Sequence, residues 1–310
     1  MSGLHHVTAI AGDAARNHDF YTRVLGLRFV KKTVNYDDPG TYHLYFGDET
    51  GSPGTILTFF PWGHMPQGRG GVGLTQTTTY RVPESAIGYW AHRFVELGVK
   101  HEAIEKRFGE SVLGFTDPDG LGLALVGVAG AESEKAWAGS DVPVEHAIRG
   151  FHGATLLLDD AKATAGVLDV LGYEEVAREG SSIRFKARGS DVGNVIDIRE
   201  AKGFLPGRMG RGSVHHLAFR AKDDQEQADM RRRLVEEHRM HVTEQIDRNY
   251  FRSMYFKEPG GIIFEIATDQ PGFSIDEPVE SLGTKLVLPP FLEGRRAQIE
   301  AHLVPLKEVA

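Results

Sequence analysis

The sequence predicts an α+β fold in which four βαβββ modules pair into two barrel-like halves. A strand, an amphipathic helix and further strands recur in the same order four times along the 310 residues. Three of the four predicted helices end in Leu-Gly at matching offsets, and glycine commonly terminates a helix. A single module is too small to bury both faces of its sheet, so we expect the modules to pair.

Composition limits the classes of function. With 41% hydrophobic residues the chain can bury a full core, and its length suits two domains or one barrel. A formal net charge of -8 argues against a general nucleic-acid binder. The chain has no cysteine, which excludes a thiol nucleophile, a disulfide and an iron-sulfur cluster. Any metal must therefore rest on histidine and carboxylate side chains.

The first residues carry no charged segment followed by an apolar one, and no apolar run approaches the length of a membrane span. We therefore expect a cytoplasmic protein that binds neither a membrane nor nucleic acid. The sequence leaves a homo-oligomer open.

The first module sets the pattern. Residues 4–10 alternate like a strand, and Asp13 is a suitable N-cap for a helix that ends at Gly26. Three strand-like segments follow, at 28–34, 42–46 and 55–60.

The other three modules repeat this order. Their opening strands are predicted at 75–82, 151–158 and 213–221, their helices at 84–98, 161–172 and 224–237, and their closing strands at 121–126, 194–199 and 262–267. The predicted organisation is module 1 at 1–66, module 2 at 67–130, a polar linker at 131–147, module 3 at 148–203, module 4 at 204–270 and a C-terminal extension at 271–310. A short amphipathic helix at 291–303 is expected to pack over modules 1 and 4.

Two His-His pairs stand out. His5-His6 opens module 1, His215-His216 opens module 4, and Glu265 lies inside the closing strand of module 4. An unpaired buried carboxylate is costly, so proteins usually provide it with a cation.

Aligning the modules shows which pair of modules can hold a metal. The alignment puts Thr77, Gly153 and His216 at the position of His6, and Thr58, Ala124 and Asp197 at the position of Glu265. Pairing modules 1 and 4 brings together three donors, His6, His216 and Glu265, with Thr58 in the fourth place. We therefore predict one metal-binding half with these three ligands and one structural half.

This repeated module with these ligand positions resembles the vicinal oxygen chelate superfamily, which includes glyoxalase I, extradiol dioxygenases and bleomycin-resistance proteins. Within it, the chain most closely resembles the ring-cleaving dioxygenases that act on para-hydroquinones. The likeness spans nearly the whole chain and includes the segments at 29–33, 42–46, 53–55, 149–152 and 281–283.

Two imidazoles and one carboxylate on one face of a metal are typical of non-haem Fe(II) oxygenases, because positions remain open for substrate and dioxygen. A fourth protein ligand, as in a glyoxalase I type site, would crowd that arrangement, so Thr58 favours oxygen activation. The resemblance implies an Fe(II)-dependent, extradiol-type dioxygenase that opens a substituted para-hydroquinone, or less favourably a catechol, with O2. Mn(II) suits the same ligands. A glyoxalase-type isomerase or lyase, or a non-catalytic drug-binding protein of the same fold, stays open.

The resemblance also implies three residues around the metal. His5 would lie near the substrate and take part in acid-base transfer, Tyr255 would donate a hydrogen bond to the substrate, and Arg248 would stabilise charge. The alternative for His5 is a packing role, because strand alternation sends it to the face opposite His6. The alternatives for Tyr255 and Arg248 are a half-buried core tyrosine and a surface arginine. The other histidines considered, His43, His64, His101, His146 and His152, are interpreted as structural or exposed.

Overall fold

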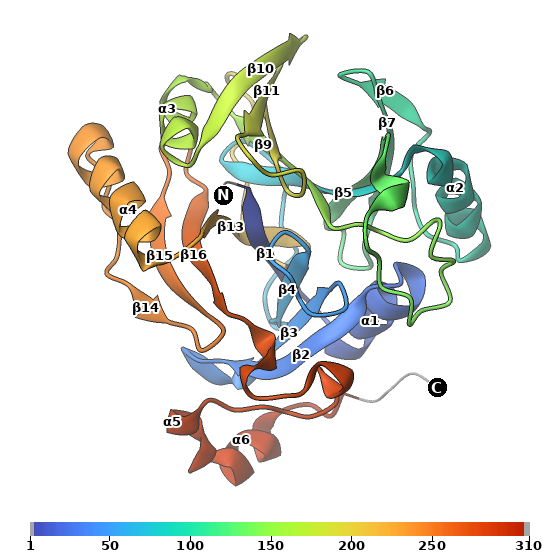
Figure 1. Cartoon of the computed structure of the whole chain (residues 1–310), viewed down its shortest axis with the longest axis vertical. Helices are drawn as coiled ribbons and strands as arrows, with labels where there is room; N and C mark the ends of the chain where they lie inside the picture. Colours follow the sequence, from blue (N-terminus) through green and yellow to red (C-terminus); the bar gives the residue numbers. More distant parts are fainter. Residues whose placement is uncertain (1–2, 307–310) are drawn as a thin grey trace.

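The computed structural model describes residues 3–306 and contains two curled eight-stranded sheets with helices along their outer sides (Figure 1). Each sheet combines strands from two modules, which confirms the predicted α+β fold of four modules in two half-barrels. None of the described helices is both long and apolar enough to cross a membrane.

The first sheet holds the strands of the first and fourth modules. Its order is β14 (Ile246–Asp247), β15 (Phe251–Lys257), β16 (Ile263–Pro271), β13 (Ser213–Ala221), β1 (Leu4–Ala11), β4 (Ile56–Pro61), β3 (Asp38–Gly47) and β2 (Arg28–Asn35). The opening strands β1 and β13 meet antiparallel at the centre. Each opening strand also pairs in parallel with its own closing strand, β4 or β16.

The second sheet repeats this topology. Its order is β10 (Tyr173–Glu179), β11 (Ser182–Ala187), β12 (Val195–Glu200), β9 (Phe151–Leu158), β5 (Leu74–Pro83), β8 (Gly122–Val128), β7 (Glu110–Thr116) and β6 (Glu105–Arg107). The outer strands β6, β10 and β14 were not located from the sequence. Strands β6 and β14 are very short, and β10 is rich in charged side chains, so none shows a clear apolar alternation.

The register of both sheets agrees with the alignment of the modules. The aligned closing-strand residues Thr58, Ala124, Asp197 and Glu265 pair with Thr8, Thr79, Thr155 and Ala218, respectively. Each partner stands two residues after the aligned position of its opening strand, so the four sites are geometrically equivalent.

Four helices follow the opening strands: α1 (Ala14–Asp19), α2 (Ile87–Glu96), α3 (Lys162–Val170) and α4 (Asp224–His238). The predicted cap is confirmed, since Asp13 Oδ1 accepts a hydrogen bond from the Arg16 amide at 2.7 Å. Helix α1 continues as a π-helix, η1 (Phe20–Val24), and a 3-10 turn, η2 (Glu84–Ala86), precedes α2. Another 3-10 turn, η3 (Ala131–Ser133), begins the linker. Gly26 follows the π-helix with φ of +69°, a conformation that favours glycine.

The C-terminal extension contains η4 (Phe273–Ile275), η5 (Val279–Ser281), α5 (Pro290–Glu293) and α6 (Arg296–His302). The single helix predicted at 291–303 is wrong, because the helical run is interrupted between Glu293 and Arg296. The module boundaries stay a prediction, and their outermost residues, 1–2 and 307–310, lie outside the described residues.

The extension is tied to strand β2 at the edge of the first sheet (Figure 1). The fully buried Lys31 places Nζ 2.6 Å from Asp276 Oδ1 and 2.5 Å from Glu277 Oε2. The Val287 amide donates to the carbonyl of Lys32 at 2.9 Å. These contacts brace the wall of the first half-barrel.

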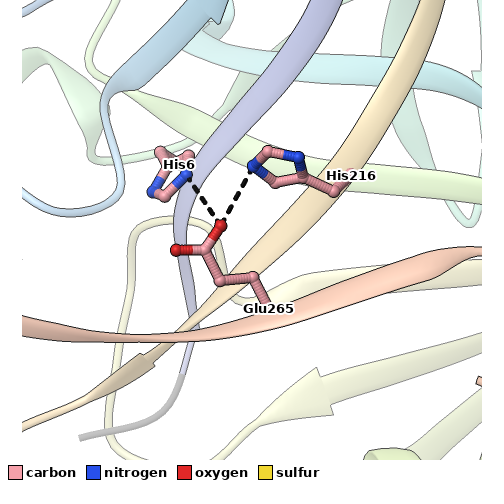
Figure 2. Close-up of side chains that lie close together, drawn as sticks. All are labelled: His6, His216 and Glu265. Carbon is pink, nitrogen blue, oxygen red and sulfur yellow. Dashed lines mark ion pairs between the residues drawn. The ribbon is translucent and has the colours of Figure 1, made fainter. Parts of the chain in front are cut away.

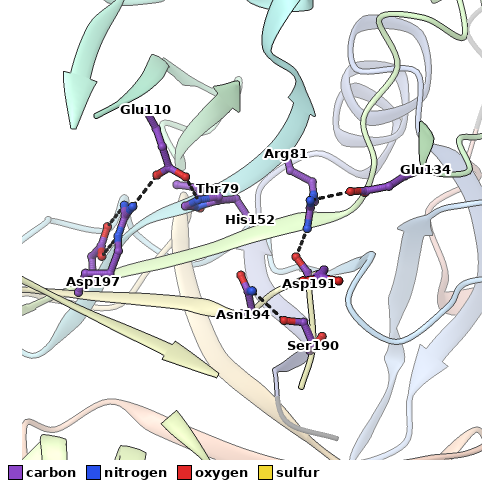
Figure 3. A network of polar contacts seen from close by, with 10 residues as sticks. Thr79, Arg81, Glu110, Glu134, His152, Ser190, Asp191, Asn194 and Asp197 are labelled. Atoms are coloured by element: carbon purple, nitrogen blue, oxygen red, sulfur yellow. Dashed lines mark hydrogen bonds and ion pairs between the residues drawn. The ribbon is translucent and has the colours of Figure 1, made fainter. Parts of the chain in front are cut away.

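The second half-barrel holds a charge network at the equivalent of the metal-binding position (Figure 3). Asp197 accepts two hydrogen bonds from Arg184, at 2.8 and 2.9 Å. Arg184 also donates to Glu110, which lies 3.1 Å from His152 Nε2. A guanidinium thus compensates the carboxylate that corresponds to Glu265.

Glu110 makes this network sensitive to acid. Burial alone would raise the pKa of Glu110, but His152 and Arg184 lower it to about 2. A carboxyl group with a depressed pKa stabilises the folded state fully at pH values above its usual pKa of 4.5. This contribution is lost as the pH falls toward 2. Glu110→Gln should therefore lower the free energy of unfolding by up to about 3 kcal/mol at pH 6. Solvent screening of this partly exposed carboxylate makes the decrease smaller.

Urea unfolding at pH 6 and pH 3 measures the effect. The difference in free energy of unfolding between wild type and Glu110→Gln should be smaller at pH 3 than at pH 6. Glu105→Gln, at an exposed position in the same hairpin, is the control. A gap that is independent of pH would contradict the assignment.

Candidate metal centre

Three candidate ligands converge at the centre of the first sheet. His6 lies on β1, His216 on β13 and Glu265 on β16, and β13 pairs with both of the other strands. Glu265 Oε2 is 3.3 Å from His6 Nε2 and 3.0 Å from His216 Nε2 (Figure 2). Exposure of the three residues is 2%, 6% and 0%. Within residues 3–306, this is the one cluster of histidine and carboxylate donors close enough to hold an ion.

The preceding histidines orient the two imidazoles. His6 Nδ1 is 3.0 Å from His5 Nδ1, and His216 Nδ1 is 2.8 Å from His215 Nδ1. When His6 and His216 donate through Nδ1, each directs the lone pair of Nε2 toward Glu265. Metal-binding histidines commonly donate the other ring N–H to a neighbouring acceptor in this way.

Glu265 supplies the charge that a cation would balance. Ser253 donates to Oε1, whereas no described residue makes a regular hydrogen bond to the buried Oε2. Leaving a buried carboxylate oxygen without a partner is costly. Two imidazole nitrogens and this oxygen facing one point therefore fit a divalent metal ion.

The protonation states suit metal binding. Burial would raise the pKa of Glu265, but His6 and His216 hold it well below its usual range. Burial is the main cause that lowers the pKa of His216. It also lowers the pKa of His5 strongly and that of His215 to about 3. An anionic Glu265 and a neutral His216 are the forms in which these side chains bind metals.

A cavity of about 480 Å³ opens in front of the cluster. It is lined by His6, Asn35, Tyr36, Asp37, Asp38, His43, Tyr45, Phe60, Trp62, His215, His216, Arg248, Phe251, Tyr255 and Ile263. No described residue of the C-terminal extension is among them. The extension instead packs against a residue of the cavity wall, since the ring centroids of Phe291 and Tyr36 lie 5.8 Å apart.

The structure brings the predicted Tyr255 and Arg248 together at this cavity. Arg248 Nε donates to the Tyr255 hydroxyl at 3.3 Å, and its Nη1 lies 3.1 Å from Asp37 Oδ2. Burial and Glu265 raise the pKa of Tyr255 above its usual value. Although burial alone would lower the pKa of Arg248, its contacts with Tyr255 and Asp37 raise it. Tyr255 thus keeps its proton and Arg248 its charge.

His5 lies behind His6 and does not line the cavity. Its ring packs against Phe251 with centroids 5.1 Å apart, and the residue is 2% exposed. This placement favours a role in positioning His6, and a direct catalytic role for His5 stays a prediction. Its counterpart in module 4, His215, does line the cavity.

A hydrogen-bonded chain behind the fourth ligand position was missed from the sequence. Thr58 Oγ1 lies 2.8 Å from Thr8 Oγ1 and 2.8 Å from His43 Nε2, and His43 Nδ1 lies 2.8 Å from the Tyr45 hydroxyl. These contacts occupy Thr58. The strand register could have indicated this contact. Tyr45 pairs with Thr58 in module 1 in the same way that Tyr255 pairs with Glu265 in module 4.

The second half-barrel has a cavity of about 460 Å³ but no comparable donor cluster among residues 3–306. Its floor includes Thr77, Ala124 and Asp197, as the alignment of the modules predicts.

The family model of the glyoxalase/bleomycin resistance protein/dioxygenase superfamily matches residues 3–125. MhqO of Bacillus subtilis (strain 168), provisionally named a ring-cleaving dioxygenase, is 48% identical over 98% of this chain and 96% of its own length. The chain therefore belongs to the glyoxalase/bleomycin resistance protein/dioxygenase superfamily, as its resemblance predicted.

Further relatives place the chain within the superfamily. A chlorohydroquinone/hydroquinone 1,2-dioxygenase from Sphingobium indicum is 32% identical over 96% of this chain and 95% of the relative. The crystal structure of a provisionally named dioxygenase from Bacillus subtilis superimposes with a TM-score of 0.93 at 48% identity, over 99% of this chain and 97% of that one. Glyoxalase I from Zea mays, at 14% identity and a TM-score of 0.66 over 87% of this chain and 93% of that one, shares the fold.

Glu265→Gln tests the candidate ligand set. The substitution removes the anionic donor, so affinity for Fe(II) or Mn(II) should fall by more than about 100-fold, since even residues beyond the ligands contribute about 10- to 100-fold. Calorimetric titration of metal-free protein measures the change.

Asp197→Asn, at the equivalent position of the second sheet, is the matched control and should keep wild-type metal affinity. Unchanged affinity in Glu265→Gln would refute the ligand assignment.

Proposed function

We propose that this chain is an Fe(II)-dependent ring-cleaving dioxygenase that opens a substituted para-hydroquinone, or a related dihydroxylated aromatic, with O2. The observation that carries the proposal is the cluster of His6, His216 and Glu265 at the end of an aromatic-lined cavity. The names of the relatives, ring-cleaving dioxygenases and a hydroquinone dioxygenase, support the same reaction.

The three donors suit the proposed metal. Iron(II) bound by two imidazoles and one carboxylate keeps open positions for a substrate oxygen and for dioxygen, and it can transfer electrons between them. Manganese(II) accepts the same ligands and is the second candidate.

Tyr255 is placed to bind and orient the phenol. Its hydroxyl oxygen accepts the hydrogen bond of Arg248, and we expect its O–H to donate to a substrate oxygen. The raised pKa keeps that proton on Tyr255 at neutral pH. Arg248 adds a positive charge beside the same hydroxyl, which favours the phenolate form of the substrate.

His215 and His43 complete the polar end of the cavity. Both are neutral, because burial lowers the pKa of each. If His216 donates to His215 Nδ1, the Nε2–H of His215 remains a hydrogen-bond donor for a ligand. These groups can orient a substrate without adding charge near Glu265.

Two other functions fit less well. A glyoxalase-type isomerase would use a further protein ligand, whereas Thr58 at that position is engaged by Thr8 and His43. A protein that only binds small molecules has no need of three buried metal donors, one of them a carboxylate whose Oε2 receives no regular hydrogen bond from the described residues.

Oxygen uptake tests the proposal. Protein reconstituted anaerobically with Fe(II) is mixed with oxygenated buffer and a substituted para-hydroquinone, a catechol or a glutathione hemithioacetal. Oxygen consumption is expected with the hydroquinone and, at a lower rate, with the catechol. A protein that consumes no oxygen with any phenol but isomerises the hemithioacetal would exclude the dioxygenase.

Tyr255→Phe tests the proposed role of the hydroxyl. Removing a proton donor to the reacting oxygen should lower kcat by about 100-fold or more, since general acid-base groups typically contribute about 10²- to 10⁴-fold. Iron content should not change, because Tyr255 is not a proposed ligand. Tyr80→Phe, the same change at a buried tyrosine of the second sheet, should leave kcat intact. Wild-type turnover in Tyr255→Phe would remove Tyr255 from the mechanism.

A further inference from the structure

The cavity is larger than a bare dihydroxybenzene needs. Cavities of about 300 to 1,000 Å³ commonly bury most of a drug-sized ligand, and this cavity measures about 480 Å³. A single ring with its hydroxyl groups at the metal donors would leave much of this space unfilled. The remaining volume therefore has the size of a substantial ring substituent.

One wall of that space is aromatic. Phe60 is the second-last residue of strand β4, and Trp62 follows the strand, with the two ring centroids stacked at 4.9 Å and an interplanar angle of 27°. The ring of His43 extends this wall toward the metal donors, with its centroid 4.4 Å from that of Phe60. The rings of His215 and Trp62 form a T-shaped contact with centroids 5.9 Å apart. The row of rings thus runs from the hydrogen-bonded chain at Thr58 to the half-buried Trp62.

Apolar side chains also face the cavity from other strands. Phe251 on β15 and Ile263 on β16 both line it. A flat or branched apolar group bound in this cavity would find apolar side chains on three different strands and in the loop that holds Trp62. Burial of such a group is favourable because it removes apolar surface from water.

The charges around the cavity disfavour an anionic substituent. Arg248 is the one arginine or lysine among the described lining residues, and it is already engaged by Asp37 and Tyr255. Asp37 on the turn after β2 and Asp38 at the start of β3 add negative charge. A carboxylate on the ring would lack a free cation and would meet these aspartates.

We infer that the substrate ring carries a bulky, uncharged, apolar substituent, and that Trp62 with Phe60 binds it and determines specificity. This inference rests on the proposed function, because the hydroxyl-bearing ring is placed at His6, His216 and Glu265. It adds the chemical class of the substituent and the residues that select it.

Binding to zinc-loaded protein under anaerobic conditions separates this inference from turnover. Zinc(II) accepts histidine and carboxylate ligands but has no redox chemistry. The probes are hydroquinone, tert-butylhydroquinone and 2,5-dihydroxybenzoate, titrated by calorimetry. Wild type should bind the tert-butyl compound at least about tenfold more tightly than hydroquinone, the lower end of what one methylene contributes in an apolar pocket. The carboxylated ring should bind more weakly than hydroquinone.

Trp62→Ala should reduce the preference for the tert-butyl compound about tenfold or more while keeping zinc. Trp137→Ala is the matched control, since Trp137 lies in the linker against Arg28, and it should keep the preference. Trp62→Phe, a milder change, should show an intermediate preference. Tryptophan fluorescence shows whether the ligand binds beside Trp62. Quenching by the tert-butyl compound should persist in Trp137→Ala and fall in Trp62→Phe.

Equal affinity for all three probes, tighter binding of the carboxylated ring, or an unchanged preference in Trp62→Ala would overturn the inference. If zinc-loaded protein shows the predicted preference but iron-loaded protein consumes no oxygen, the proposed reaction fails while the apolar ligand class stands.

Discussion

The antiparallel pairing of β1 with β13 is the interaction on which the candidate site depends. It joins the first module to the fourth, places His6 and His216 on adjacent strands and continues through β16 to Glu265. Neither module holds three donors by itself, so folding of both modules must precede the assembly of the site. A buried carboxylate that faces two imidazoles then makes a bound cation the simplest way to satisfy the centre of this sheet.

The two half-barrels meet the same electrostatic requirement in different ways. Glu265 and Asp197 occupy equivalent positions on their closing strands, and each needs a positive partner because it lies in a largely buried sheet. In the second half-barrel Arg184 fills this need with two hydrogen bonds. Arg184 pairs with Asp197 on the neighbouring strand. The residue that pairs with Glu265 in the same way is Tyr255, which carries no positive charge. In the second half-barrel the compensating cation is thus the side chain of Arg184, whereas in the first we propose that it is a metal ion bound beside the cavity.

Much of this arrangement was predictable from the sequence because β-strand register converts sequence spacing into position. The repeated strand-helix-strand order gave the fold, and aligning the modules brought His6, His216 and Glu265 together. The chain of Thr58, His43 and Tyr45 was not predicted, since its members carry no ligand spacing. The Arg248–Asp37 ion pair was also missed, because it joins opposite edges of a sheet whose curvature the sequence does not reveal. The break in the C-terminal helical run at Gly294 agrees with the low helix propensity of glycine and was overlooked. The strands β6 and β14 are too short to show an apolar alternation.

The central claim is that one metal ion is bound between β1, β13 and β16, and that the second half-barrel binds none. Anomalous X-ray diffraction from crystals grown with Mn(II), or anaerobically with Fe(II), tests it directly. The account predicts one strong anomalous peak within coordination distance of His6 Nε2, His216 Nε2 and a Glu265 carboxylate oxygen, and no peak beside Asp197. A peak located elsewhere, or an empty cluster at saturating metal, would contradict it.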